Sequence, residues 1–317
     1  MIYDELKTRP AGRPKVSIGL FVYNGEKFIR KRLDSLLEQT FTDFELIISD
    51  NASTDSTSAI CEEYAKKDKR IRYIRQEKNK GAIWNFIFVL EEAKSDYFVW
   101  AAVDDLLSPD FLEKNVKVLE SNKNVVGSIG KVKPFDTNDN DSEHDEIDSA
   151  FRNFKKKLRT TFKSKSFGTW SISGAYEKKV RFYLKKSTCA IIYGVFRTDK
   201  LRESIVIESF IADDWAIMLN ILKHGDFHVV DDVFLYRFER GRESKGIINL
   251  ARSFNQGFHG IVFPWYPITA WCIKNLGIKI FLKNLDFFIQ LNFEGMISFL
   301  IDLTRLFIHK ISKKIEI

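Results

Sequence analysis

The sequence predicts an α/β fold with a doubly wound, mostly parallel sheet flanked by helices and followed by a C-terminal helical extension. Two observations support this fold class. Strand-like runs alternate with helical patterns over the first hundred residues, and these runs are apolar at nearly every position. Such strands are typical of a parallel sheet that helices cover on both faces. At 317 residues the chain is long enough for one large domain and an appendage.

Residues 16–57 hold the first β-α-β unit. An apolar strand ends in Tyr23 and Asn24, a helix follows, and a second strand ends in Asp50 and Asn51. In an open parallel sheet, ligands bind at the carboxyl ends of the strands, so we expect these four side chains to meet in one crevice. A planar aromatic ring beside a carboxylate suits a nucleotide base.

The alternation then continues with a strand at residues 71–76, a helix at 82–93 and a strand at 97–103. Asp104 and Asp105 follow this last strand directly. Paired carboxylates there suit Mg²⁺ or Mn²⁺, which take oxygen ligands and share them between a carboxylate or two and substrate phosphates. An acidic loop that caps the next helix is the alternative interpretation.

That next helix is predicted to begin with Pro109 at its first position, where the missing N–H costs nothing. An insertion follows at about residues 136–187, in which an acidic tract joins a basic cluster. We expect a loop or small lid there rather than core. The sheet is predicted to resume with strands at residues 189–197 and 227–238.

A helix separates these two strands and begins with Asp213 and Asp214. Carboxylates at a helix N-terminus are favoured by the exposed N–H groups and by the helix dipole. A purely structural role is therefore one interpretation of this acidic pair.

Several short motifs stand in the order and spacing of a known enzyme family. They are Tyr23-Asn24, Gln39-Thr40 and Asp50-Asn51-Ala52-Ser53-Thr54-Asp55. On these motifs the chain resembles family 2 glycosyltransferases, which are inverting enzymes of the GT-A fold. The resemblance implies a GT-A domain at residues 15–245 and a nucleotide-diphosphate sugar as donor. It also implies that Tyr23 stacks on the base and that Asp50 accepts a hydrogen bond from it.

Further site residues follow from the same resemblance. The family's Asn-x-Gly…Asn pattern, which shapes the nucleotide pocket, matches Asn79, Gly81 and Asn85. The family's Asp-x-Asp-Asp motif implies a metal ligand at Asp104 and a sugar or metal contact at Asp105. The chain departs from this motif because Ala102 occupies the position of the first Asp.

The acidic pair at the later helix also gains a role from the resemblance. Asp214 matches the base that removes the proton from the attacking hydroxyl, and Asp213 matches its neighbour. Arg237 and Arg240 lie where family members have a segment that closes over the diphosphate, and guanidinium groups pair well with phosphate oxygens. Glu239 stands at the usual His position of that segment, which is a second departure.

Three alternatives differ in class from this hypothesis. A nicotinamide dehydrogenase would need G-x-G-x-x-G after the first strand, and only Gly25 is present there. A sugar nucleotidyltransferase would need a Gly-rich, basic loop at the same place. The third alternative is a catalytically silent protein that keeps the GT-A shell and acts at a membrane surface or in a complex. Ala102 and Glu239 favour this third alternative slightly.

Composition and charge restrict the partners. Hydrophobic residues at 44% and charged residues at 29% indicate an ordered globular protein. Cys61, Cys189 and Cys272 form no C-x-x-C pair, which favours a reducing compartment. Residues 1–14 form a charged tail without the apolar core of a secretory signal, so we expect a cytoplasmic protein. The net charge of +7 suits an anionic membrane surface, and its dispersion argues against nucleic acid.

The helical extension is predicted at residues 246–317. Pro264 and Pro267 interrupt its most apolar stretch, and its remaining faces are mostly Phe, Leu and Ile. Such a helix either lies on the cytoplasmic face of a membrane or packs on protein, including a second copy of the chain. A charge at about every turn argues against a membrane crossing. One polar stripe recurs every three or four residues, at Lys279, Lys283, Asp286, Gln290, Glu294, Ser298, Asp302, Arg305 and His309.

Overall fold

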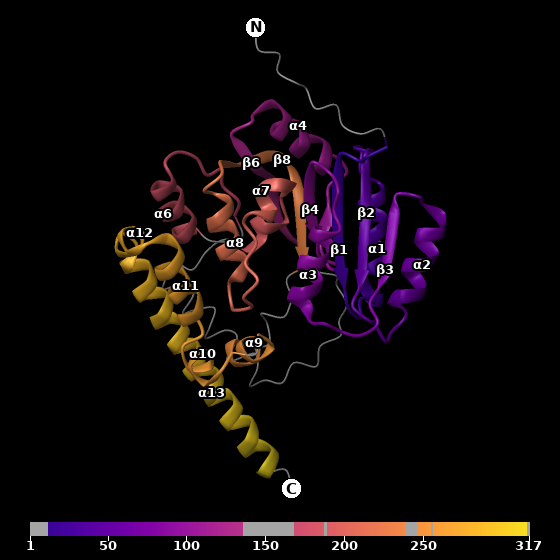
Figure 1. Ribbon diagram of the computed structural model, residues 1–317. Coiled ribbons are helices and arrows are strands. Elements are labelled where there is room, and N and C mark those ends of the chain that lie inside the picture. Colours follow the sequence, from indigo (N-terminus) through magenta and orange to yellow (C-terminus); the bar gives the residue numbers. More distant parts are fainter. Residues whose placement is uncertain (1–11, 136–167, 187–188, 239–245, 255, 316–317) are drawn as a thin grey trace. The chain divides into compact units, whose positions relative to one another are not determined.

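The computed structural model describes residues 12–135, 168–186, 189–238, 246–254 and 256–315 (Figure 1). The described residues fall into two compact units. The first unit comprises Met1–Lys131, Tyr193–Glu203 and His228–Tyr236. The second comprises Val132–Ile192, Ser204–Phe227 and Arg237–Ile317. Most of the predicted tail and most of the predicted insertion lie outside the described residues.

A parallel sheet forms the centre of the first unit, as the sequence predicts. It contains β1 (Val16–Val22), β2 (Phe44–Asp50), β3 (Ile71–Arg75) and β4 (Tyr97–Ala101), in the order β3-β2-β1-β4 (Figure 1). Every residue of β4 is buried, and so are all but one in each of β1 and β2, which is why these strands are apolar on both faces. The register pairs Val22 with Asp50, so both strands end at the same edge.

Antiparallel strands extend this sheet beyond β4. The described residues form an eight-stranded sheet, whose order continues from β4 to β7, β6, β8 and β5. These strands are β5 (Leu106–Leu107), β6 (Val125–Phe135), β7 (Val195–Arg197) and β8 (Asp226–Phe238). The predicted sheet is therefore confirmed in its first half, and its second half is antiparallel.

Helices α1 (Glu26–Leu37), α2 (Thr57–Lys67), α3 (Ala82–Glu91), α4 (Phe111–Ser121) and α7 (Thr198–Arg202) complete the first unit. Close packing between α3 and the sheet requires a glycine in β1. A Cβ on Gly19 would lie 2.6 Å from Phe98 Cζ and 2.8 Å from Val89 Cγ2. Any side chain there would push α3 away from β1 and β4.

Two local predictions are wrong. Helix α4 begins at Phe111, with Asp110 as its N-cap, so Pro109 lies in the preceding turn rather than in the helix. The predicted strand at residues 189–197 is a 3₁₀ helix over Cys189–Tyr193, followed by the short strand β7. An apolar run of this length does not show whether the segment forms a strand or a helix, because a buried element of either kind has the same composition.

The second unit is mainly helical. It contains α6 (Tyr176–Lys186), α8 (Asp213–Ile221), α9 (Ile247–Ser253), α10 (Phe258–Val262), α11 (Tyr266–Leu276), α12 (Ile278–Leu282) and α13 (Leu285–Ile315). Helix α8 packs on the C-terminal helices through Trp215, whose ring stacks on Trp265 at 5.6 Å. Gly295 of α13 allows this arrangement, since a Cβ there would lie 2.3 Å from Trp265 Cδ1. The C-terminal helices therefore support the helix that carries Asp213 and Asp214.

Helix α13 has two chemically different faces. Asp302, which the sequence places on the polar stripe, is only 4% exposed and accepts a hydrogen bond from the Ile247 N–H at the start of α9. The opposite face exposes an apolar stripe formed by Leu285, Ile289, Phe293, Leu300, Leu303, Phe307 and Ile311. Within the described part of the chain, Leu285–Ile308 is the one segment long and apolar enough to cross a membrane. The charged residues of this segment are therefore too few for their spacing alone to exclude a membrane crossing.

Candidate active site

The loops after β1 and β2 are joined by hydrogen bonds at the carboxyl edge of the sheet. Asn24 N–H donates to Ser53 Oγ at 2.9 Å, and Thr54 N–H donates to Asn24 Oδ1 at 2.8 Å. Asn24 adopts a φ of 51°, which its short polar side chain tolerates better than most residues do. The predicted meeting of these two loops is therefore present in the first unit.

Asp50 is fully buried at this edge, and both of its carboxylate oxygens accept hydrogen bonds. Ser53 N–H donates to Oδ1 at 2.8 Å, and the Tyr73 hydroxyl donates to Oδ2 at 2.9 Å. Burial, together with the neighbouring Asp50 carboxylate, raises the pKa of the Tyr73 phenol, so it stays protonated and remains a donor. Asp50 thus holds the loop after β2 in shape, and each oxygen keeps a second lone pair for another donor.

Asn51 links the loop after β2 to the loop after β3. Its Nδ2 donates to Asn79 Oδ1 at 2.9 Å and to the Gly81 carbonyl at 3.1 Å, and its Oδ1 accepts the Lys80 N–H at 2.9 Å. Gly81 has a φ of 91°, a conformation that favours glycine. These residues, predicted as parts of one nucleotide pocket, therefore belong to one hydrogen-bonded network.

Asn85 lies beneath this network, on the first turn of α3. Its Nδ2 donates to the Ser49 carbonyl at 2.9 Å, and within the described chain its buried Oδ1 has no hydrogen-bond partner. Tyr23 differs from these buried groups because it is 44% exposed at the end of β1. An exposed ring beside fixed polar loops is free to stack on a planar ligand.

The acidic pair follows β4 at the same edge of the sheet. The turn that carries it lies against the start of α1, since a Cβ on Gly25 would be 2.9 Å from Val103 Cγ2. Asp104 is half-buried, whereas Asp105 is only 3% exposed. In the first unit, the turn after β4 that carries both acids therefore contacts the turn after β1 that carries Tyr23 and Asn24.

The donor set at this edge suits a hard divalent cation that binds together with a phosphate. The described residues contain no group of three or more His, Cys, Asp or Glu side chains able to hold a metal ion. Mg²⁺ and Mn²⁺ need only one or two protein carboxylates when phosphate oxygens and water complete the shell. The partly exposed Asp104 fits that requirement, and a deeply buried Asp105 fits it less well.

The second unit carries the other predicted acids at the N-terminus of α8. Asp213 Oδ1 accepts the Asp214 N–H at 2.8 Å, and in the described residues Asp213 Oδ2 is buried without a partner. Burial raises the pKa of the Asp213 carboxyl to about 7, while backbone N–H groups oppose that rise. Ala212, which precedes the helix, has a φ of 69°, an uncommon conformation for a residue with a Cβ.

Asp213→Asn should stabilise the fold in a pH-dependent way. Between pH 3.8 and about 7 the Asp213 carboxyl binds a proton only in the folded chain, so stability falls as pH rises through this range. Asn resembles the protonated acid and avoids the cost of the buried charge. We expect a higher melting temperature at pH 8, by about 2–4 °C for each kcal/mol recovered, and little change near pH 4.

Differential scanning calorimetry at both pH values measures this effect. Asp286→Asn is the matched control, because Arg181 lowers the pKa of the exposed Asp286 carboxyl. That substitution should not raise the melting temperature at pH 8. An unchanged melting temperature for Asp213→Asn at pH 8 would show that the Asp213 carboxylate is not destabilised in the folded chain.

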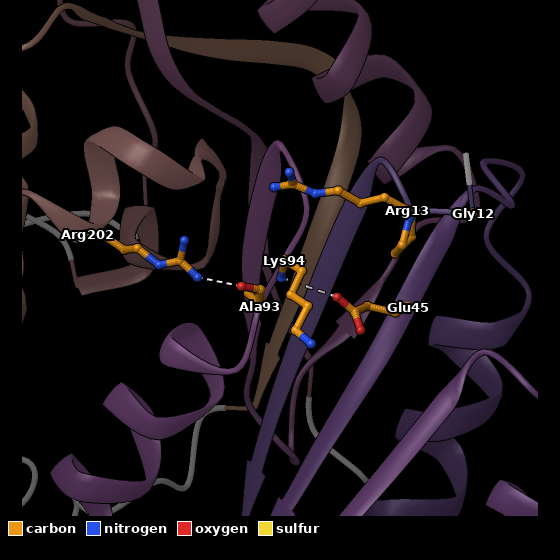
Figure 2. Close-up of a pocket in the computed structure, with 7 residues that line it drawn as sticks. Gly12, Arg13, Glu45, Ala93, Lys94 and Arg202 are labelled. Carbon is orange, nitrogen blue, oxygen red and sulfur yellow. Dashed lines mark hydrogen bonds between the residues drawn. The ribbon is translucent and has the colours of Figure 1, made fainter. Parts of the chain in front are cut away.

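The two predicted arginines and one cavity of the described chain remain to be placed. Arg237 is the second-to-last residue of β8, and its Nη1 donates to Cys189 Sγ at 3.0 Å in the second unit. Arg240 lies outside the described residues. A cavity of about 590 Å³ opens at the amino ends of the parallel strands, beside Arg13 and Lys94 (Figure 2). It contains none of the predicted site residues, and ligands of parallel sheets bind at the opposite edge.

Sequence reasoning missed two groups that the structure places beside the predicted site. They are the Tyr73 hydroxyl on Asp50 and the fully buried guanidinium of Arg32, whose charge interacts with those of Asp105 and Asp104. Tyr73 looks like an ordinary strand aromatic, and Arg32 like a surface residue of an amphipathic helix. A charged residue on the apolar face of α1 was the available signal for Arg32.

Comparison with known proteins identifies the family and the fold. The sequence model of the family described as Glycosyl transferase family 2 matches residues 17–184, more than half of the chain. The chain therefore belongs to glycosyl transferase family 2. EpsE of Bacillus subtilis (strain 168), named as a glycosyltransferase, is 37% identical over 118 residues, which are 36% of this chain and 42% of EpsE. The chain spans less than half the length of the curated relatives it matches.

Two solved structures show the same fold at low sequence identity. S. aureus TarS 1-349 in complex with UDP-GlcNAc has a TM-score of 0.55 and 17% identity, covering 82% of this chain and 66% of TarS. The mannosyltransferase PcManGT of Pyrobaculum calidifontis, in complex with GDP-Man and Mn²⁺, has a TM-score of 0.51 and 16% identity, covering 94% and 88%. These similarities confirm the predicted GT-A fold.

Proposed function

We propose that the protein is an inverting glycosyltransferase. It transfers a sugar from a nucleotide-diphosphate sugar to a hydroxyl group of a glycan or of a lipid-linked acceptor. Family membership supports this activity, as do the nucleotide sugars bound by the two structural neighbours. The observation that carries the proposal is the network at the carboxyl edge of the sheet, where the exposed Tyr23 lies beside the fixed Asp50, Asn51 and Gly81.

The predicted nucleotide, metal, sugar and phosphate residues have separate roles in donor binding. Tyr23 stacks on the base, the second lone pairs of Asp50 accept a hydrogen bond from it, and Asn79, Gly81 and Asn85 shape the pocket. Asp104 would hold a Mg²⁺ or Mn²⁺ ion, and that ion would supply positive charge to neutralise the diphosphate. Asp105 lies next to it, toward the sugar, and Arg237 and Arg240 pair with phosphate oxygens.

Asp214 acts on the acceptor. Its carboxylate removes the proton from the attacking hydroxyl as the acceptor oxygen forms a bond to the anomeric carbon. The bond between that carbon and the diphosphate breaks, and the nucleoside diphosphate leaves with the electron pair. One displacement inverts the anomeric centre. Asp213 supports this base by placing a second acid beside it.

A donor screen tests the proposal. The full chain is incubated with a panel of sugar nucleotides and Mn²⁺, and the release of free nucleoside diphosphate is measured. We expect release from one donor class, and loss of that release in Tyr23→Ala. Absence of release from every donor, with and without Mn²⁺, would favour the catalytically silent protein that Ala102 suggests.

The cation should bind weakly unless a nucleotide is present. Asp104 is the main protein ligand, and Ala102 supplies no second carboxylate, so the diphosphate must complete much of the coordination. Calorimetric titration of Mn²⁺ should show weak binding to the free protein and tighter binding with a saturating nucleoside diphosphate. Tight binding without nucleotide would contradict the assignment of Asp104 as the main ligand.

We also propose that the protein binds the cytoplasmic face of a membrane through α13 without crossing it. The exposed apolar stripe of α13 suits the boundary between headgroups and acyl chains. Asp302 supports a surface position, because its carboxylate is committed to the N-terminus of α9 and would be costly to place in the hydrocarbon core. The exposed Lys310 adds attraction to anionic lipid, worth about 1 kcal/mol near such a surface.

Liposome flotation tests this second proposal on the full chain. We expect the protein to float with anionic vesicles, and a variant with Ile289→Glu and Phe293→Glu to stay in the soluble fraction. Gln290→Glu is the matched control, because it adds a charge on the exposed polar face of the same helix. If the unmodified protein stays soluble, the stripe is a surface for protein, including a second copy of the chain.

A further inference from the structure

One face of α1 contacts the chain segment that comes after the acidic turn. Arg32 and Ser35 are three residues apart, so they lie on the same side of α1, and Gln39 follows the end of the helix. Ser35 Oγ donates to the Leu107 carbonyl at 3.2 Å and accepts the Leu107 N–H at 3.0 Å. Gln39 Nε2 donates to the Ser108 carbonyl at 2.8 Å. This face therefore fixes the chain that leaves Asp105.

Arg32 is the charged member of this face, and it is only 1% exposed. Burial lowers the pKa of its guanidinium to about 10, and the carboxylates of Asp105 and Asp104 oppose that shift, so the side chain is cationic at neutral pH. Within the described residues its Nε and Nη1 have no hydrogen-bond partner. A buried cation of this kind needs a nearby negative charge to be tolerated.

The charge of Asp105, in the acidic turn, acts on Arg32 without a direct ion pair between them. Asp105 is the carboxylate with the largest effect on Arg32, and it is itself 3% exposed. Asp104 is half-buried, so it is the more accessible member of the pair. The two acids and Arg32 together carry one net negative charge rather than two. Ala102 adds none.

We propose that Arg32 is a positioning residue that compensates the charge of Asp105 and leaves Asp104 as the carboxylate that meets the cation and the donor diphosphate. The inference rests on the proposed function. It makes cation binding depend on the charges of these three residues. Asp105 then influences the cation through its charge and not through a bond to it.

A charge-swap series tests this inference by Mn²⁺ binding rather than by activity. The free Mn²⁺ signal in electron paramagnetic resonance gives the Mn²⁺ affinity with saturating UDP, and with GDP in parallel. Asp105→Asn leaves the three positions neutral overall, so Mn²⁺ should bind on the order of tenfold more weakly. Adding Arg32→Met restores one net negative charge and should return the affinity to within about threefold of the unmodified protein.

Two control variants separate charge from structure. Asp105→Asn with Arg32→Lys keeps the positive charge and should stay weak. Asp105→Asn with Arg30→Met should also stay weak, because Arg30 lies on the exposed side of α1 and pairs with Glu63 at 2.9 Å. If Arg32→Met does not fold in this background, Arg32→Gln replaces it, with the same expected recovery.

The outcomes distinguish this inference from the proposed function. If the unmodified protein binds Mn²⁺ with UDP or GDP but removal of Arg32 gives no recovery, Asp105 is a direct ligand or a structural residue and the inference is wrong. If the unmodified protein binds no Mn²⁺ with either nucleotide, the cation role in the proposed function fails together with the inference.

Discussion

Asp214→Asn is expected to lower the rate of transfer by about 10²- to 10⁴-fold, the usual effect of losing a general base. Binding of the nucleotide should change less than about twofold in calorimetry, since the base acts on the acceptor hydroxyl and not on the donor. The substitution is nearly isosteric, and Asp214 N–H can still donate to Asp213 Oδ1, so the start of α8 should be retained.

Asp199→Asn provides the control for this prediction. Asp199 is an acid in the first turn of α7, so its loss removes a similar interaction with a helix N-terminus without touching the proposed base. It should leave the transfer rate near that of the unmodified protein. Near-native turnover in Asp214→Asn would mean that Asp214 only stabilises the start of its helix.

Asp50→Asn is expected to weaken nucleotide binding by about tenfold to a hundredfold. A hydrogen bond to a charged group contributes about 1.5–3 kcal/mol, and Asn lacks the second carboxylate oxygen that would accept from the base. Asn keeps one carbonyl oxygen for the Ser53 N–H, so the loop after β2 should retain its shape. Calorimetric titration of the preferred nucleotide, with the melting temperature as a check on folding, measures the effect.

Tyr73→Phe separates the two roles of Asp50. It removes the 2.9 Å hydrogen bond from the Tyr73 hydroxyl but leaves the carboxylate in place. We expect a lower melting temperature and nucleotide affinity within about threefold of the unmodified protein, because the lost bond lies outside the proposed base contact. Equal weakening in Tyr73→Phe and Asp50→Asn would mean that Asp50 supports the loop and does not contact the base.

The ends of the parallel strands could be predicted because their signals are local. Each strand from β1 to β4 is a short apolar run followed by polar residues, and parallel strands place those residues at one edge of the sheet. The loops after β1 and β2 are therefore joined by hydrogen bonds of Asn24 to Ser53 and Thr54. The membership of family 2 was likewise predictable, because its motifs stand in order within the first hundred residues.

The structure decided which of these groups are exposed. Asp104 and Asp105 are adjacent and identical in sequence, yet Asp105 is buried beside Arg32 while Asp104 is half-buried. Asp213 lies in the first turn of α8, and burial under distant parts of the chain raises its pKa to about 7. Burial depends on contacts between residues far apart in the chain, so no local pattern reports it.

The direction of the later strands and the environment of α13 were decided in the same way. β7 is a three-residue strand after a 3₁₀ helix, and its antiparallel pairing with β4 rests on residues about a hundred positions away. Asp302 belongs to a polar stripe in sequence but is buried at the N-terminus of α9. The sequence by itself determined the period of each element and the chemistry at its ends. Only the tertiary structure decided partners, burial and charge compensation, because these depend on which distant side chains exclude water from one another.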